Sequence, residues 1–171
     1  MDPEPGTLGR LTTRADETRT EAPEPRTTRI AILGCGFIGT VHSFALRAVI
    51  RGGLSDAAVV ATCDVEVDKA RRLLEAHGEG VATVNVDEAL QDVDAAWVCT
   101  PTAMHHEVVE RCVASGVAIY CEKPLARDLK GAEEISRLVQ SSGLTNQVGL
   151  VLRAAPLYAS IAALSLSLIH I

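Results

Sequence analysis

The sequence predicts an α/β fold, a doubly wound domain on a six-stranded, mainly parallel sheet (a Rossmann arrangement). From residue 29 onward, short apolar runs alternate with amphipathic stretches of helical periodicity. The runs are apolar throughout and lack the alternation typical of strands with one exposed face. Strands of this kind, separated by single helices, occur in parallel sheets covered on both faces. A glycine-rich turn after the first run supports the same fold.

The expected strands and helices follow one another along the chain. The strands are RIAIL (29–33), AVVATCD (58–64), GVATV (80–84), AAWVCT (95–100), VAIYCE (117–122) and NQVGLVL (146–152). The helices are expected over 37–50, 66–77, 86–91, 104–114 and 128–141. In the fourth helix, Met104, Val108 and Cys112 share one face, which fits helical periodicity better than alternation. Right-handed crossovers between these strands complete the doubly wound arrangement.

The bulk composition limits the class of partner. The chain has 171 residues, 47% of them hydrophobic and 22% charged, as in a globular protein with one domain. A net charge of -6 argues against nucleic acid or an anionic membrane as a partner. No apolar run approaches the length of a membrane span, so we predict no membrane contact and a cytoplasmic location.

The cysteines predict neither a disulfide framework nor a metal site. There are five, an odd number, and none are spaced as C-x-x-C. Most lie in or beside apolar runs, where a reduced thiol packs as a small hydrophobic group. The cysteines are Cys35, Cys63, Cys99, Cys112 and Cys121.

A phosphate-binding turn is expected directly after the first strand. Gly34, Gly36 and Gly39 have the G-x-G-x-x-G spacing, and the loop opens a helix, which is the context that the motif requires. The first glycine permits the tight turn, the second lets a pyrophosphate approach the backbone, and the third lets helix and strand pack closely. Phe37 and Ile38 complete the loop, which predicts a dinucleotide site.

Asp64 is expected to bind the adenosine ribose of that dinucleotide. It ends the second strand, somewhat beyond the usual spacing of about 20 residues from the glycine motif. Its carboxylate can accept hydrogen bonds from the ribose hydroxyls and would repel a 2′-phosphate. NAD is therefore favoured, with NADP as the alternative cofactor. The same residue could instead cap the following helix.

The fourth and fifth strands end in polar residues that belong to the same predicted sheet edge. Thr100 and Pro101 follow the fourth strand, and His105 begins the next helix. A nicotinamide is expected near this edge, where strand order reverses. A histidine at a helix start is more often solvated than functional, and so is a lysine at the end of a strand.

The fifth strand delivers Glu122, Lys123 and Pro124 to that edge. Together with GCGFIG and TPTAMHHE, this EKP motif resembles the Gfo/Idh/MocA family of dehydrogenases over about residues 29–156. The resemblance implies hydride transfer between NAD(P) and a sugar, inositol or related polyol substrate. It implies that Lys123 is catalytic and lies beside the reacting carbon, where it binds the substrate hydroxyl or assists proton transfer. It also implies that the positions matching Thr100, Pro101 and His105 line the cofactor pocket, and that the full-length form is a homo-oligomer.

Composition and the resemblance together divide the chain into three segments. Residues 1–28 are rich in Pro, Thr, Glu and Arg, and we expect a disordered leader or sequence upstream of the true start. Residues 29–152 are the expected dinucleotide-binding domain. Residues 153–171 are expected to be a truncated start of the family's second domain. The last six, 166–171, match the translation of a sequencing adapter and are interpreted as an artefact, with an apolar C-terminal helix as the alternative. The fragment is therefore expected to be inactive alone.

Two other functions remain open at this point. A free-standing module that senses NAD(H) would need the glycine loop but no ammonium beside the nicotinamide, so Lys123 speaks against it. A short-chain dehydrogenase would carry a Tyr-x-x-x-Lys pair, which the sequence lacks. We further expect Trp97 to be a core residue, and His42 and His77 to be structural or solvated.

Overall fold

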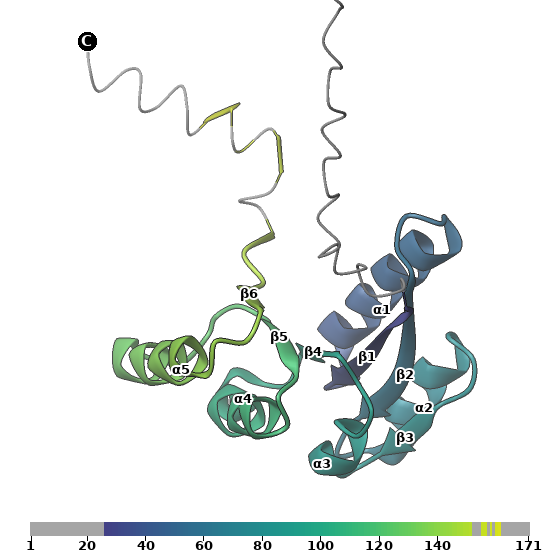
Figure 1. The fold of residues 1–171 in the computed structure, drawn as a ribbon, viewed down its shortest axis with the longest axis horizontal. Helices are drawn as coiled ribbons and strands as arrows, with labels where there is room; N and C mark the ends of the chain where they lie inside the picture. The colour runs from purple at the N-terminus through teal and green to yellow at the C-terminus, as the bar shows by residue number, and fades with distance from the viewer. Residues whose placement is uncertain (1–25, 152–154, 157, 159, 162–171) are drawn as a thin grey trace, which may run out of the picture.

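The predicted α/β fold is present, as a six-stranded sheet in the order β3-β2-β1-β4-β5-β6 with every pairing parallel (Figure 1). The computed structural model describes residues 26–151, 155, 156, 158, 160 and 161. The expectations for 1–25, 152–154 and 162–171, including the adapter-like tail, lie outside the described residues. This strand order is that of doubly wound dinucleotide-binding domains.

The elements match the predicted pattern of strands and helices. The strands are β1 (Thr28–Leu33), β2 (Ala57–Cys63), β3 (Val81–Thr83), β4 (Ala95–Val98), β5 (Ala118–Cys121) and β6 (Asn146–Val148). The helices are α1 (Phe37–Arg51), α2 (Val67–Glu75), α3 (Val86–Ala89), η1 (Thr102–Met104), α4 (His105–Ala114) and α5 (Leu129–Ser142). Several strands end one or more residues earlier than predicted, so that Asp64, Thr100 and Glu122 lie just beyond the strands that carry them.

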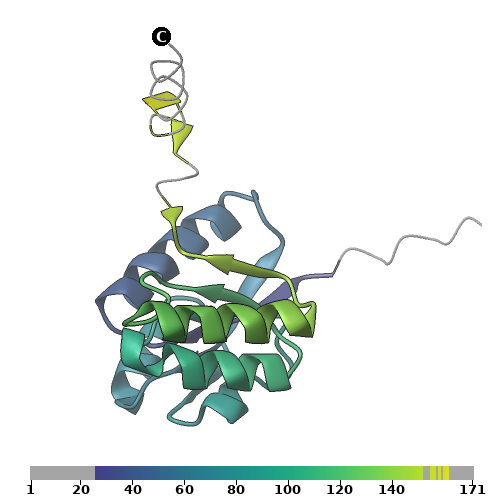
Figure 2. The same ribbon diagram turned by 90° about the vertical axis from the view of Figure 1, so that its left-hand side faces the viewer.

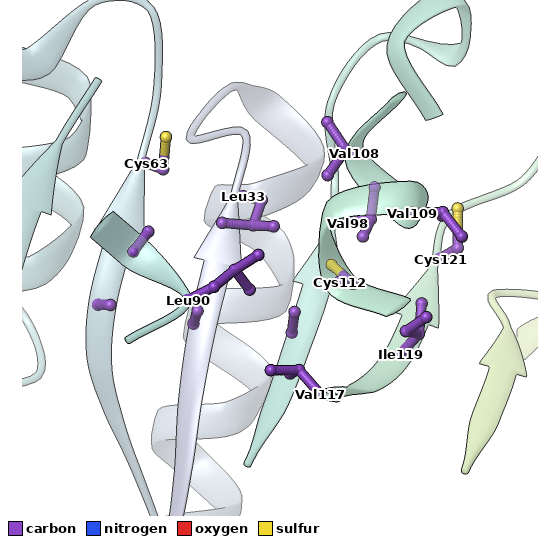
Figure 3. Close-up of a cluster of buried hydrophobic side chains, with 14 of the residues drawn as sticks. Leu33, Cys63, Leu90, Val98, Val108, Val109, Cys112, Val117, Ile119 and Cys121 are labelled. Atoms are coloured by element: carbon purple, nitrogen blue, oxygen red, sulfur yellow. The ribbon is translucent and has the colours of Figure 1, made fainter. Parts of the chain in front are cut away.

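The sheet separates two hydrophobic clusters. One cluster lies against α3, α4 and α5, and Figure 3 shows Val98 and Cys121 of the sheet beside Val109 and Cys112 of α4. The other contains Ile30, Ile32 and Val59 and packs against α1 and α2. Figure 2 shows α4 and α5 side by side in front of the sheet, with α1 on its far side. Burial on both faces explains why the strands read as continuous apolar runs.

On the α1 side of the sheet, the half-buried ring of Trp97 in β4 stacks on Tyr120 in β5, with ring centroids 5.3 Å apart. Trp97 packs against the α1–α2 cluster, as expected for a core residue. The ring of His42 from α1 meets Tyr120 edge-on at 5.1 Å. These three rings connect the first helix to the middle of the sheet.

Candidate cofactor site

The three glycines of the loop between β1 and α1 have different surroundings. Gly34 has a φ of +96°, and a Cβ there would lie 2.6 Å from the backbone of Cys99 and Thr100. A Cβ on Gly39 would lie 2.0 Å from the carbonyl oxygen of Gly34. Both positions therefore require glycine for the loop to close. A Cβ on Gly36 would meet nothing within 4 Å, so the chain leaves open space there.

The N-terminus of α1 faces this open space. Gly36 is its N-cap, no side chain caps it, and its first turn contains no acidic residue. The first N–H groups of a helix have no partner within the helix and carry a partial positive charge. Phe37 is 86% exposed and Ile38 is half-buried beside it. The helix start can thus bind an anionic phosphate, as the glycine spacing predicts.

Asp64 connects the ends of β1 and β2. Its Oδ2 accepts the backbone N–H of Cys35 at 2.8 Å, and its Oδ1 accepts that of Glu66 at 2.9 Å. The second bond closes the turn before α2, whose N-cap is Glu66 and which has no side-chain cap, so the suggested helix-capping role of Asp64 is wrong. A carboxylate has about four acceptor positions, and further hydrogen bonds to a ligand therefore remain possible.

The corner after β4 holds a polar atom without a partner. Thr100 Oγ1 is the one buried side-chain oxygen or nitrogen that makes no hydrogen bond in the part of the chain that the structure describes. The backbone carbonyl oxygen of Thr100 lies 2.9 Å from Nε2 of His105. The other ring nitrogen of His105, Nδ1, lies 3.2 Å from the carbonyl oxygen of Leu125. His105 is 1% exposed and joins the corner after β4 to the loop after β5. It lies beneath the corner, and the expected cofactor contact of His105 stays a prediction.

A cleft of about 420 Å³ brings most of the predicted residues together. The cleft lies at the ends of β1 and β4, where the strand order reverses and the connections leave toward opposite faces of the sheet. Doubly wound domains bind their ligands at this point. Its lining includes seven of the predicted site residues: Gly34, Gly36, Phe37, Ile38, Asp64, Thr100 and Pro101. The other five predicted residues are not among the lining residues: Gly39, His105, Glu122, Lys123 and Pro124.

Thiol chemistry does not fit this cleft. Cys99 contributes to its lining and Cys35 to an adjoining cavity. Burial raises the pKa of both thiols to about 12, so they stay protonated at neutral pH. All five cysteines are buried and unpaired.

Lys123 leaves the sheet at the same edge as the glycine loop. Leu33 of β1 pairs with Val98 of β4, and Val98 pairs with Cys121 of β5. Lys123 follows Cys121 by two residues, and Thr100 follows Val98, the partner of Cys121, by two residues. Parallel strands in register therefore place the two residues along one edge. The lysine is exposed, and the peptide bond that joins it to the following proline is cis.

Glu122 points to a different environment from its neighbour Lys123. It is 5% exposed, and its Oε1 lies 2.7 Å from Nε2 of His42 and 3.3 Å from the hydroxyl of Tyr120. Its Oε2 accepts the backbone N–H of Lys123 at 3.0 Å. Burial opposes ionisation, but the bonds from His42 and from the Lys123 backbone outweigh it and hold the pKa of the carboxyl below its usual range.

The pairing of His42 with Glu122 was not predicted from the sequence. His42 was expected to be structural or solvated, and its side chain is 16% exposed. Its place on the first helix after the glycine motif gave no indication of the partner, which lies 80 residues further along the chain. The cofactor contact expected of Glu122 stays a prediction.

The strand order, the glycine loop and the cleft define a dinucleotide-binding domain of the kind found in oxidoreductases. Residues 28–150 match the model of the oxidoreductase family with an NAD-binding Rossmann fold, Gfo/Idh/MocA. The chain belongs to this family, and the predicted resemblance is confirmed. The cofactor class expected from the sequence is that of the family.

Named relatives agree with this membership. The chain is 35% identical over 130 residues to inositol 2-dehydrogenase of Rhizobium meliloti (strain 1021), which covers 76% of the chain and 38% of the relative. The chain is also 26% identical to KijD10, a 3-ketoreductase from Actinomadura kijaniata solved in complexes with NADP. Its three structures match with TM-scores of 0.70 to 0.71, covering 81% of this chain and 42% to 44% of that one.

The fold also matches a scyllo-inositol dehydrogenase from Lactobacillus casei with bound NAD(H) and scyllo-inositol. That structure has a TM-score of 0.73 at 22% identity, and the match covers 82% of this chain and 41% of the other. The chain thus spans about two fifths of the length of these relatives. None of the helices in the described part of the chain has the length and apolar character needed to cross a membrane.

Proposed function

We propose that this chain is the cofactor-binding part of an oxidoreductase that transfers hydride between NAD and an inositol, sugar or related polyol. The observation that carries the proposal is the common sheet edge of the glycine loop, Thr100 and Lys123. A dinucleotide bound in the cleft would reach from the start of α1 toward the strand that carries the lysine. The substrate class is supported by the inositol dehydrogenases among the relatives.

The residues of the cleft fit a dinucleotide. The open space beside Gly36 and the free N–H groups at the start of α1 suit the pyrophosphate. Asp64 would accept hydrogen bonds from the ribose hydroxyls, and its charge favours NAD over NADP. The unpartnered hydroxyl of Thr100 would gain a hydrogen-bond partner on the ligand, which removes the cost of leaving it buried alone.

Lys123 is the proposed catalytic residue of the chain. Bound NAD⁺ accepts the hydride that leaves the alcohol carbon. As that C–H bond breaks, the alcohol oxygen loses its proton to a base and gains negative charge. The ammonium of Lys123 would hold this oxygen and stabilise the developing charge, which is effective where bound substrate and cofactor keep the group from reorganising.

The proposal also covers the compartment and the assembly of the complete protein. Unpaired cysteines are typical of proteins from reducing compartments, so the five buried thiols support a cytoplasmic location. A homo-oligomer of the complete protein stays a prediction from the family resemblance.

Cofactor binding and turnover test the proposal separately. Calorimetric titration of this chain should give saturable binding of NAD⁺, tighter than that of NADP⁺. The complete product of the gene should reduce NAD⁺ with myo- or scyllo-inositol, followed by absorbance. Lys123→Ala should lower kcat at least ~100-fold while the Kd for NAD⁺ changes less than about twofold.

A matched control is Lys130→Ala, which removes an exposed ammonium from α5 and should leave kcat unchanged. Near-normal turnover of Lys123→Ala would reject the catalytic role of that lysine. Tight binding of NAD⁺ with no polyol or sugar oxidised would instead favour the NAD(H)-sensing module.

A further inference from the structure

The buried carboxylate of Glu122 does not line the cofactor cleft, and three groups contact it from different directions. His42 approaches from α1, the hydroxyl of Tyr120 from β5, and the backbone N–H of Lys123 from the loop after β5. We propose that Glu122 and His42 are positioning residues, which fix the backbone of Lys123 relative to the helix that begins at the glycine loop. This role rests on the proposed function of Lys123.

The Glu122 side chain first anchors the backbone of Lys123. The Glu122 carboxylate bends back and accepts the N–H of the next residue, so the peptide unit that joins the two residues has a fixed orientation. Charged acceptors make stronger hydrogen bonds than neutral ones. An exposed lysine side chain has many rotamers, but its starting point and direction are set by this backbone.

The His42 side chain then connects this anchor to the helix after the cofactor loop. His42 lies one turn after Gly39 on α1, and its 2.7 Å bond to Glu122 joins α1 to the end of β5. The strands β1 and β5 are separated by β4, so no backbone ladder joins the glycine loop to the lysine directly. The His42–Glu122 pair therefore supplies a direct side-chain link between the two proposed functional segments.

The surroundings close over this pair and leave the carboxylate little freedom. A Cβ on Gly149, just after β6, would lie 2.8 Å from Glu122 Oε1 and from the Tyr120 hydroxyl. The residue is a buried glycine, so backbone packs directly on the carboxylate. A buried charge with three partners in a fixed frame keeps one geometry, because any movement would leave it unpaired.

Hydrogen exchange at the amide of Lys123 tests the anchoring without any turnover. In this chain, Glu122→Gln should accelerate exchange of that amide at least ~10-fold, because a single amide oxygen must replace both carboxylate oxygens. His42→Ala should have a similar effect, and His42→Gln, whose side-chain N–H can donate to the carboxylate, should restore slow exchange. Glu133→Gln, an exposed glutamate of α5, serves as the control and should change nothing.

The comparison is made on variants whose circular dichroism shows the folded domain, with exchange at Ile119 in β5 as an internal reference. Accelerated exchange confined to the Lys123 region supports positioning. Equal acceleration at Ile119 would mean a general loss of stability and would overturn it, as would unchanged exchange in both Glu122→Gln and His42→Ala.

A kinetic readout then links the anchor to the proposed reaction. In the complete product of the gene, Glu122→Gln and His42→Ala should lower kcat at least ~10-fold with the Kd for NAD⁺ nearly unchanged. His42→Gln should recover most of that loss. If the amide responds as expected and no variant or wild-type protein turns over any polyol, the proposed function fails while the anchoring geometry stands. Full kcat in the variants would overturn the positioning role.

Discussion

Cys35 and Asp64 are joined by a hydrogen bond of 2.8 Å, from the backbone N–H of the first to Oδ2 of the second. The acidic residue after β2 therefore holds the glycine loop after β1 in place. It has this structural role in addition to the proposed ribose-binding role. A substitution at Asp64 should thus affect the shape of the loop and the choice of cofactor together.

Asp64→Asn should weaken NAD⁺ binding about tenfold and reduce the preference for NAD⁺ over NADP⁺. The amide oxygen can still accept the N–H of Cys35, but the negative charge that would repel a 2′-phosphate is lost. Calorimetric Kd values for both cofactors check this. Asp68→Asn, an exposed carboxylate in the first turn of α2, is the control. An unchanged ratio of the two Kd values would contradict the role of the charge.

Alanine at Gly36 and at Gly39 should have opposite consequences. Gly39→Ala would place a methyl group 2.0 Å from a backbone oxygen, and we expect it to cost about 3 kcal/mol or more of folding stability. Gly36→Ala should cost at most about 1 kcal/mol, the effect of alanine at an N-cap, since nothing lies nearby and alanine can adopt its φ of -73°.

Gly36→Ala should nevertheless raise the Kd for NAD⁺ at least ~10-fold, because the methyl group occupies the space proposed for the pyrophosphate. Urea unfolding and calorimetric titration separate the two effects. Equal loss of stability in both variants, or normal binding by Gly36→Ala, would contradict this account of the loop.

The adjacent histidines at the start of α4 should differ sharply in their contribution to stability. His105→Ala removes a buried ring and its contacts with the carbonyl oxygens of Thr100 and Leu125, at a cost of about 3 kcal/mol. His106→Ala removes a side chain that is 43% exposed and should cost less than about 0.5 kcal/mol. Urea midpoints of the two variants provide the measurement. Similar values would contradict the stabilising role of the buried His105 ring.

The ionisation of Glu122 should make the domain less stable in acid. Its pKa is lowered on folding, whereas in the unfolded chain a glutamate titrates near about 4.3. Between the two pKa values the unfolded chain binds more protons. The stability that this carboxylate contributes is thus complete above the unfolded value and lost as pH falls through the lowered one.

Urea midpoints of the wild-type chain and Glu122→Gln, measured between about pH 3 and pH 6, test this linkage. The advantage of the wild-type chain should be largest near the upper limit and should shrink below about pH 4. The groups that face this carboxylate are His42, the Tyr120 hydroxyl and the Lys123 amide. A difference that stays constant over the whole range would argue against a lowered pKa.

The sequence predicted the strands and helices well because burial on two faces leaves a clear apolar pattern. The ends of the strands were less accurate. An apolar run records where side chains are buried, but the residues just after a ladder can remain buried too, as Cys99 and Glu122 do. Asp64 and Thr100 accordingly read as the last strand residues and lie in the loops that line the cleft.

Side-chain direction beyond a strand end could not be predicted. Glu122 and Lys123 are neighbours in one motif, yet one is buried toward α1 and the other is exposed. His105 resembles a solvated residue at a helix start, but two carbonyl oxygens from separate loops surround it. Such partners depend on how distant loops meet, and no local spacing encodes that.

The stacked rings in the middle of the sheet give the chain an optical reporter. Trp97 is its sole tryptophan, and the ring on which it stacks, Tyr120, directs its hydroxyl to the Glu122 carboxylate. Indole emission is therefore sensitive to the contact between His42 of the first helix and the Glu122 carboxylate after β5. A shift in the emission maximum of this tryptophan would therefore report the loss of that contact without an added dye or label.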